Sequence, residues 1–466
     1  MIKIIDNNWK RYFKEYLFFG YNICFIKHNS TVMKMKKNIK RTSELFNFIK
    51  KGSCCFTCVD YIKNILIDKG YKELSEKNNW NIECGKYFVI RNDASIIAFE
   101  IPKKYDNRFY IVTTHCDTPS LLLKPEGINY NNNYLKHNVM IYGGLLNYGW
   151  LDVPFSLAGR IIYKKGESLK SKIVDFKDSL LTIPSVAIHQ NDKANSNLDI
   201  NMQQDLQPIL SIDNDVKLWE NLLKKEAGNN EVIDYDLYAY NCYEPMMIGL
   251  NKNLMLSPRI DNLTSVYAGL YSFIDSKSDY IKVFCSFNNE EIGSLTEEGA
   301  DSNFLIDVLK RIAASINLDI QESLSKSFLI SSDNTHAQHP NHPEYGDDTG
   351  KVYLGKGVTI IREIESTTNG LSLSVIKNIC DNNHIKYQVS TTKNDLSSGS
   401  TLSGISLRHL SVLSVDVGIS ELAMHSSIEL CSIDDVFELY KLLLCFYQSH
   451  IEIKDEEITI ESKMVC

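Results

Sequence analysis

The sequence predicts an α/β protein in which a mixed sheet flanked by helices is interrupted by a β-rich insertion. Apolar runs typical of buried strands, such as residues 109–115 and 281–287, lie on both sides of the middle of the chain. From about residue 254 these runs alternate with helical patterns, as in a sheet covered by helices. Between residues 120 and 243 the runs are short and alternating, with Gly, Pro and Asn between them, which favours an all-β segment.

These observations divide the chain into four parts. Residues 1–35 form an N-terminal extension of unknown role, residues 36–119 the first part of the main domain, residues 120–250 the insertion, and residues 251–466 the second part of the main domain. Composition is ordinary for a globular protein, at 44% hydrophobic and 23% charged residues. A net charge of −8 gives no basic footprint for nucleic acid or an anionic membrane, so a peptide or small molecule is the expected partner.

The elements follow from the spacing of apolar residues. Helical spacing predicts helices over residues 43–50, 59–70, 261–276 and 304–316, and residues 87–91 and 95–99 read as a hairpin. The Asn-rich residues 190–205 are expected to form a loop. The 12 scattered cysteines, several inside apolar runs, indicate reduced thiols and a cytoplasmic protein. The apolar stretch over residues 16–25 is too short to span a membrane.

Possible metal ligands recur where the apolar strands end. His115 and Asp117 close the first run, Glu290 and Glu291 follow residues 281–287, and Asp333 follows residues 327–332. His425 comes after a fourth run, over residues 412–417. Side chains at the carboxyl ends of strands converge on one crevice. Two histidines with several carboxylates suit hydrolytic zinc, manganese or cobalt.

Each motif also has an alternative interpretation. Asp261, expected in the first turn of a helix, suits a carboxylate that bridges two metals, but it could equally be a helix N-cap. Glu290 and Glu291, expected on extended backbone, would point to opposite sides, so that one could ligate and the other act as a base; otherwise the pair is solvated surface. His336 in the loop after Asp333 could be structural.

Taken in order along the chain, these motifs resemble the aspartyl aminopeptidase family of dinuclear zinc metallopeptidases, from about residue 45 to residue 436. The pieces that carry the resemblance are Gly70-Tyr-Lys-Glu-Leu74, Gly85-Lys-Tyr-Phe-Val89, Thr114-His-Cys-Asp-Thr-Pro119, Leu157-Ala-Gly-Arg160, Ile183-Pro-Ser-Val-Ala-Ile-His189, Ser257-Pro-Arg-Ile-Asp-Asn262, Asn289-Glu-Glu-Ile-Gly-Ser294, Ser332-Asp-Asn-Thr-His-Ala-Gln-His-Pro-Asn341 and Leu422-Ala-Met-His-Ser426.

The resemblance implies two zinc ions per subunit, with cobalt or manganese as the alternatives. His115 and Asp333 would be terminal ligands of one ion, Glu291 and His425 those of the other, and Asp261 would bridge the two.

The remaining roles are also implied by the resemblance. Glu290 would be the general base and Asp117 would support the first histidine ligand. His336 would contact substrate, and His189, in the insertion, would reach the active site of a neighbouring subunit. The family assembles through this insertion, so a homo-oligomer, a dodecamer built from dimers, is expected.

The chain departs from the family around the substrate. Lys-Gly-Pro followed by a further lysine and an Arg-Tyr pair is replaced by Lys356-Gly-Val-Thr-Ile-Ile361-Arg362 and Ser366-Thr-Thr-Asn369. Asp-x-Pro-Cys-Gly-Ser-Thr survives as Asp395-Leu-Ser-Ser-Gly-Ser-Thr401, and Gly52-Ser-Cys-Cys-Phe56-Thr57 replaces Ser-Pro-x-Pro-(Phe/Tyr)-His. The Arg after Met-His-Ser-x is Ile428. We therefore expect the metal ligands to be kept and the substrate rim to be altered.

The sequence thus predicts a metalloaminopeptidase that removes N-terminal residues from peptides. Two rivals remain at this point. One is a related dinuclear carboxypeptidase or deacylase, and the other is a catalytically weakened, shell-forming relative. The intact set of metal ligands favours the aminopeptidase. The altered substrate rim is the feature that leaves the catalytically weakened, shell-forming relative as an alternative.

Overall fold

The computed structural model describes residues 39–196, 199–395, 408–454 and 457–461. The chain divides into two units, residues 1–45 and residues 46–466. Within the first unit, residues 39–45 are helical. The extension over residues 1–35 lies outside the described residues, as does nearly all of the segment 395–401. The second unit contains every candidate site residue, and the elements below belong to it.

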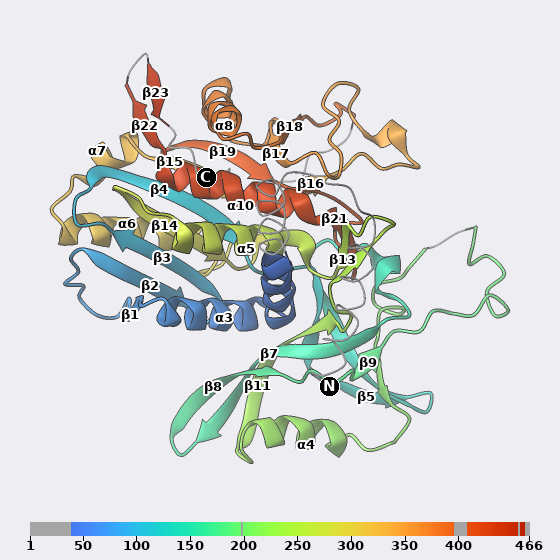
Figure 1. Cartoon of the computed structure of the whole chain (residues 1–466). Helices are drawn as coiled ribbons and strands as arrows, with labels where there is room; N and C mark the ends of the chain where they lie inside the picture. The colour runs from blue at the N-terminus through green and yellow to red at the C-terminus, as the bar shows by residue number, and fades with distance from the viewer. Residues whose placement is uncertain (1–38, 197–198, 396–407, 455–456, 462–466) are drawn as a thin grey trace, which may run out of the picture. The chain divides into compact units, whose positions relative to one another are not determined.

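The largest element of the second unit is a nine-stranded mixed sheet (Figure 1). In spatial order its strands are β1 (Lys72–Leu74), β2 (Gly85–Arg91), β3 (Ser95–Ile101), β14 (Tyr280–Phe287), β4 (Asp106–His115), β15 (Phe328–Ser332), β19 (Leu413–Gly418), β17 (Val358–Ile361) and β18 (Tyr387–Ser390). Strands β14, β4, β15 and β19 run parallel to one another at its centre. The hairpin expected from residues 87–99 is the antiparallel pair β2 and β3.

Helices cover both faces of this sheet, which is why its central strands are buried at almost every position. Alternate residues such as Ile111 and Val283 pack against α6 in one core. On the opposite face, Phe284 stacks on Phe273 of α5 and Tyr110 stacks on Phe446 of α10. The helices are α3 (Cys55–Asp68), α5 (Ile260–Asp275), α6 (Phe304–Ser315), α7 (Ile320–Ser325), α8 (Gly370–Asn382) and α10 (Ile433–Gln448). The predicted α/β class, with a mixed sheet flanked by helices, is confirmed.

The segment between β4 and β13 folds around a second sheet. Its strands, in spatial order, are β11 (Glu231–Asn241), β5 (Ser120–Asn131), β6 (Tyr134–Tyr142), β10 (Ile209–Ser211), β9 (Leu181–Thr182), β7 (Pro154–Lys165) and β8 (Ser168–Asp175). Because β11 pairs with both β5 and β7, the pairings close into a small barrel. One helix, α4 (Lys217–Glu226), packs on the barrel core; the expectation of an all-β segment missed it.

A five-stranded sheet lies between these two and consists of β12 (Met246–Ile248), β13 (Leu254–Ser257), β21 (Glu429–Ser432), β20 (Ser420–Leu422) and β16 (Thr335–His336). A hairpin of β22 (His450–Ile453) and β23 (Ile458–Glu461) follows α10. Short 3-10 turns are η1 (Asn147–Trp150), η2 (Glu290–Ile292) and η3 (Pro343–Tyr345). Among the described residues, no helix combines the length and apolar character that a membrane span requires.

The side chain of Lys282, in strand β14, connects the C-terminal end of helix α5 to the nine-stranded sheet. Its ammonium donates to the carbonyl oxygens of Phe273 and Ser276, at 2.7 and 2.8 Å, and pairs with Glu100 Oε2 at 3.0 Å. Its side chain is only 1% exposed. The burial lowers the pKa of Lys282, while Glu100 opposes that shift.

We predict that Lys282→Ala lowers the free energy of unfolding by about 3–5 kcal/mol, because it removes the buried cation that pairs with Glu100 and binds the carbonyl oxygens of Phe273 and Ser276. Lys86→Ala is the matched control, since Lys86 pairs with the same Glu100 at 3.4 Å but is exposed; it should cost less than about 1 kcal/mol. Urea unfolding of both variants measures the difference. Equal, small losses would contradict the prediction.

Candidate metal centre

Three candidate segments meet because parallel strands end at the same edge of the nine-stranded sheet. His115 is the last residue of β4, Asp333 follows β15, and Glu290 and Glu291 follow β14. The register pairs Phe287 of β14 with His115 of β4. The crevice at the carboxyl ends of these strands is therefore lined by the residues that the sequence places there.

Asp261 and His425 reach the same place from the five-stranded sheet. Asp261 follows β13, and His425 lies in the turn between β20 and β21. Helix α5 spans Ile260–Asp275, but Asp261 and Asn262 have non-helical backbone angles, so the regular helix begins after them. Asp261 therefore lies in the first turn of α5, as expected, although that turn is irregular. It is not the N-cap, because Arg259 occupies that position.

The carboxylate of Asp261 lies between the two histidines. Its Oδ1 is 3.5 Å from Nε2 of His115, and its Oδ2 is 3.5 Å from Nε2 of His425. Asp333 Oδ1 lies 3.1 Å from the first of these nitrogens, and Glu291 Oε2 lies 3.4 Å from the second. The five side chains thus form two groups that share Asp261.

These spacings are those of ligands around tetrahedral ions. With metal-to-ligand distances of about 2.0–2.2 Å, two ligand atoms of a tetrahedral zinc ion lie roughly 3.3–3.6 Å apart. Ligand atoms of His115, Asp261 and Glu291 lie within 4.8 Å of one another, and so do those of His115, Glu290 and Asp333. The donor set of imidazole nitrogens and carboxylate oxygens suits zinc, with cobalt or manganese as alternatives.

The electrostatics of the group call for a cation. Asp261 is 4% exposed and Asp333 7%, and the side chain of Glu291 is 4% exposed. Asp261 Oδ1 and Glu291 Oε1 have no hydrogen-bond partner among the described residues. Buried carboxylates that lack hydrogen bonds are costly unless a positive charge compensates them.

The pKa shifts reflect this crowding of acidic groups. Burial raises the pKa of Glu290 to about 8; His115 opposes the shift, and Asp333, Asp117 and Asp261 add to it. At Asp261, burial also acts to raise the pKa, but the contacts with the two imidazoles outweigh it and hold the pKa well below its usual range.

Glu290 and Glu291 do not lie on extended backbone, so that part of the sequence interpretation is wrong. They form the 3-10 turn η2, because Asn289 before it and Gly293 after it have left-handed angles, at φ 63° and 94°. Both side chains still face the cleft. A solvated surface location for Glu291 is excluded by the burial of its side chain.

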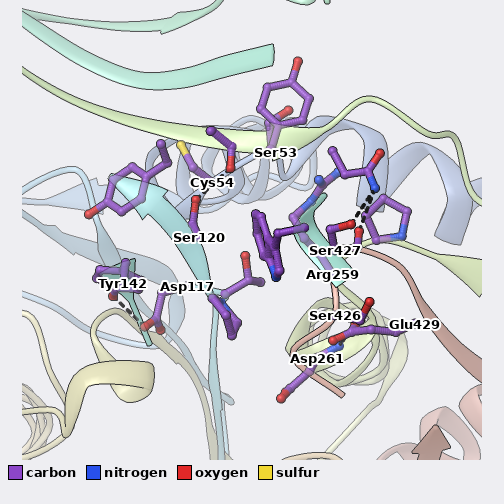
Figure 2. Close-up of a pocket in the computed structure, with 18 of the residues that line it drawn as sticks. Ser53, Cys54, Asp117, Ser120, Tyr142, Arg259, Asp261, Ser426, Ser427 and Glu429 are labelled. Atoms are coloured by element: carbon purple, nitrogen blue, oxygen red, sulfur yellow. Dashed lines mark hydrogen bonds between the residues drawn. The ribbon is translucent and has the colours of Figure 1, made fainter. Parts of the chain in front are cut away.

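Asp117 contacts both halves of the group. Its Oδ2 accepts a hydrogen bond from the Tyr142 hydroxyl at 2.7 Å (Figure 2). The same oxygen accepts a second one from the backbone N–H of Glu291 at 3.1 Å. The main-chain oxygen of Asp117 lies 3.1 Å from Nδ1 of His115, closer than its Oδ1 at 3.5 Å. The prediction that Asp117 supports His115 thus has a geometric basis in which the backbone oxygen is the nearer group.

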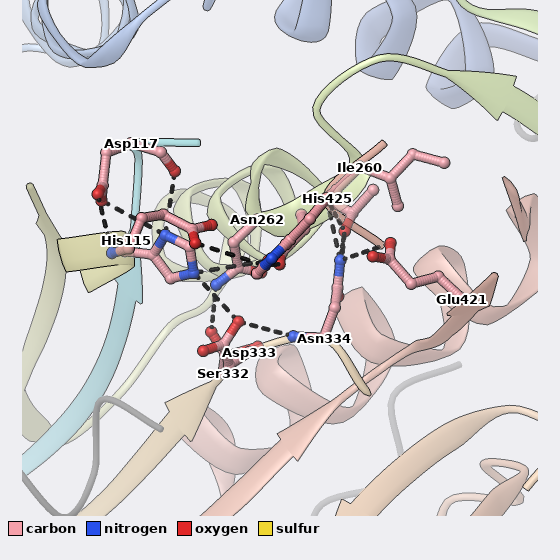
Figure 3. A network of polar contacts seen from close by, with 12 residues as sticks. His115, Asp117, Ile260, Asn262, Ser332, Asp333, Asn334, Glu421 and His425 are labelled. Carbon is pink, nitrogen blue, oxygen red and sulfur yellow. Dashed lines mark hydrogen bonds and ion pairs between the residues drawn. The ribbon is translucent and has the colours of Figure 1, made fainter. Parts of the chain in front are cut away.

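Sequence reasoning missed Glu429, which holds the two segments of the five-stranded sheet together. Its carboxylate accepts from the backbone N–H groups of Ile260 at 2.7 Å, Asp261 at 3.1 Å and His425 at 2.9 Å. It also missed Asn334, whose amide donates to the carbonyl oxygen of Ile260 at 3.0 Å (Figure 3). Neither residue ends an apolar strand run, so the pattern that found the ligands gave no signal for them.

Four of the five metal candidates, Asp261, Glu291, Asp333 and His425, line a cleft of about 700 Å³. His336 lines it, whereas His189 does not and lies exposed in the barrel segment. On the substrate rim, Ile361 and Glu363 line the cleft, while Arg362 between them is exposed and is not part of the lining.

Comparisons with known proteins agree with this geometry. The family model described as aminopeptidase I zinc metalloprotease (M18) matches residues 48–447. A probable M18 family aminopeptidase 2 of Clostridium novyi is 39% identical over 433 residues, which is 89% of this chain and 100% of that protein.

Solved structures give the same result. A cryo-EM structure of a complex of Ape4 and Nbr1 is similar with a TM-score of 0.84 and 29% identity, covering 88% of this chain and 86% of the other. The structure of an mApe1 dodecamer from S. cerevisiae has the same fold, with a TM-score of 0.75 and 24% identity over 86% of this chain and 95% of the other. The chain therefore belongs to the M18 family of aminopeptidase I zinc metalloproteases, which are peptide hydrolases, as its resemblance to the aspartyl aminopeptidases indicated.

Proposed function

We propose that the chain removes N-terminal amino acids from peptides at a dinuclear zinc centre. His115 and Asp333 are the terminal ligands of one ion, Glu291 and His425 those of the other, and Asp261 bridges them. The observation that carries this proposal is that the two oxygens of Asp261 face Nε2 atoms of different histidines, each at 3.5 Å. A carboxylate in this position is shared between two ions in dinuclear hydrolases.

Glu290 is proposed as the general base. When bound, the two ions would polarise the scissile carbonyl group and lower the pKa of a water molecule. Glu290 lines the cleft beside the ligands, and burial raises its pKa to about 8 in the metal-free site. A carboxylate there can take a proton from the attacking water and return it to the leaving amine as the C–N bond breaks. His336, which lines the same cleft, is placed to contact the substrate.

An aminopeptidase and its rivals differ in what they recognise at the substrate's end. A carboxypeptidase tolerates a blocked N-terminus and a deacylase acts on the blocking acyl group, whereas an aminopeptidase requires a free N-terminus. Assaying an N-acetylated peptide against the free peptide separates these activities. Cleavage of the blocked peptide, alone or together with the free one, would reject the proposal.

Assembly is proposed to follow the family pattern, as a dodecamer built from dimers through the barrel segment. The similar mApe1 structure is a dodecamer. Val186, Ile188 and Met202 of the segment are apolar and about half exposed, which is typical of an interface. His189, beside them, would reach a neighbouring active site. A cytoplasmic location is proposed because the described cysteines are free.

The first prediction concerns the base. Glu290→Gln keeps the size of the side chain but cannot accept a proton, so kcat should fall by about 10²- to 10⁴-fold while zinc is retained. Steady-state kinetics and zinc analysis of one preparation measure both quantities. Glu322→Gln, an exposed carboxylate paired with Lys326, should behave as the unsubstituted enzyme. Near-normal turnover at full zinc occupancy would remove Glu290 from this role.

A second prediction concerns the bridge. Asp261→Ala should reduce binding of both ions, whereas His425→Ala should chiefly weaken one, because a terminal ligand serves a single ion. Elemental analysis of zinc per chain measures this. His342→Ala is the control, since this exposed histidine pairs with Glu344 away from the ligands and should leave zinc content unchanged. Two bound ions in Asp261→Ala would reject the bridge.

A third prediction concerns specificity. Ile361 lines the cleft, whereas Arg362 is exposed and does not, so a substrate carboxylate beside Ile361 would meet no cation at that position and would lose hydration without compensation. The lysines of the cleft lining are Lys351 and Lys393. We expect N-terminal Leu or Met to be cleaved at least as well as Asp or Glu. Ile361→Lys should shift the ratio of kcat/KM values toward Glu by about tenfold, or about 1.4 kcal/mol.

Arg362→Met serves as the control for this change and should leave the ratio unaltered. Should the unsubstituted enzyme prefer Asp or Glu by about tenfold or more, the reading of this wall is wrong. In that case Lys351 or Lys393 of the cleft lining, Lys356, Arg362 or a residue of a neighbouring subunit must supply the charge.

A further inference from the structure

The chain between strands β6 and β7 belongs to the barrel segment, yet its polar contacts go to the metal centre. The carbonyl oxygen of Gly144 accepts a hydrogen bond from Nδ1 of His425 at 2.8 Å. The backbone N–H of Leu146 and the indole Nε1–H of Trp150 both donate to the carbonyl oxygen of His425, each at 3.1 Å. We call residues 143–150 the strap.

The strap holds a histidine whose backbone is unusual. His425 has φ 66°, in the left-handed region that residues with a side chain seldom adopt. Its N–H is held by Glu429 Oε1 at 2.9 Å, and its carbonyl oxygen is held by the two donors of the strap. Such a conformation persists when its surroundings fix it, and here the strap supplies two of these three hydrogen bonds.

The strap also decides which ring nitrogen of His425 can bind a metal. Donation from Nδ1–H to Gly144 leaves the lone pair on Nε2, the atom that faces Asp261 Oδ2 at 3.5 Å and Glu291 Oε2 at 3.4 Å. His115 differs, since its Nδ1 faces the main-chain oxygen of Asp117 in its own segment. The two histidines are thus oriented by different parts of the fold.

Two further contacts tie the strap to its surroundings. Trp150 is buried and stacks on Phe155 of β7, with ring centroids 5.5 Å apart, so the barrel core fixes its position. Gly143 has φ 79°, and a Cβ placed on it would lie 3.2 Å from Cβ of Glu291. The strap therefore packs closely on the second terminal ligand of the same proposed ion.

We propose that the strap is a positioning element through which the barrel segment sets the affinity of one of the two metal positions, with Trp150 as its principal positioning residue. This rests on the proposed function, in which His425 and Glu291 hold one ion. Partners that orient a metal-bound histidine typically contribute about 10- to 100-fold in metal affinity. The consequence is selective: the position that contains His115 and Asp333 should not depend on Trp150.

Titration of the metal-free full chain with Co²⁺, followed by absorption spectroscopy and by competition with a chelator, tests this. Trp150→Phe keeps an aromatic ring but removes the Nε1–H donor. It should weaken one of two Co²⁺ ions by about 10- to 100-fold. The spectrum of the ion that remains should match that of the ion remaining in His425→Ala.

Trp219→Phe is the matched control, because Trp219 is also buried in the barrel and meets His137 and Tyr235 there; both affinities should stay unchanged. Gly143→Ala provides a second variant, expected to weaken the same ion by crowding Glu291. If Trp150→Phe does not fold, the Co²⁺ affinities of Gly143→Ala test the proposal on their own.

The possible failures are distinguishable. If the unsubstituted chain binds two ions and both strap variants bind them with unchanged affinity, the strap has no positioning role. Equal weakening of both ions would also overturn the inference, since it would indicate a general structural effect. If the unsubstituted chain binds one ion, or His425→Ala weakens none, the proposed dinuclear centre falls and the inference falls with it.

Discussion

The buried carboxylate of Asp261, placed between two imidazole rings, is the group on which the arrangement of the site depends. Its two oxygens face His115 and His425 at equal distances of 3.5 Å, and Asp333 and Glu291 add two further acidic groups. Two imidazoles cannot compensate three desolvated carboxylates, so the group is costly without cations. Zinc, which the family is known to use, is the compensation that the donor atoms suit.

Three sheets contribute to this one group, and each does so for a simple geometric reason. The nine-stranded sheet supplies His115, Glu291 and Asp333 because its parallel strands end at a common edge. The five-stranded sheet supplies Asp261 and His425, and the carboxylate of Glu429 binds their backbone N–H groups together. The barrel adds no ligand to the proposed set, but its strap contacts His425 and Glu291, so the barrel is part of the site's support.

How much of this the sequence could predict depends on the range of the interaction. Strands that are buried on both faces appear in the sequence as largely apolar runs. The main sheet, its hairpin and the candidate ligands at the strand ends could therefore be predicted from local pattern. The backbone conformation at Glu290 could not be predicted in this way. The 3-10 turn starts at the left-handed angle of Asn289, and the spacing of apolar residues carries no information about that angle. The non-helical start of α5 at Asp261 was hidden for the same reason.

The spacing of apolar residues could not predict contacts between segments that are far apart in the sequence. Trp150 lies 275 positions from the carbonyl group that it binds, and Glu429 lies 168 positions from Asp261. Nothing local distinguishes this tryptophan from any other aromatic residue of a barrel core. Such residues become visible only when the fold has been built, which is why the sequence pointed to the candidate ligands and not to the groups that contact them.

The proposed dinuclear centre requires that the carboxylate of Asp261 be shared by two ions. Anomalous scattering at the zinc absorption edge from crystals of the zinc-loaded chain tests this directly. Two peaks roughly 3.5–4 Å apart, one on each side of the Asp261 carboxylate, are the predicted result. A single peak at full zinc loading, or a pair with Asp261 bound to only one of them, would contradict it.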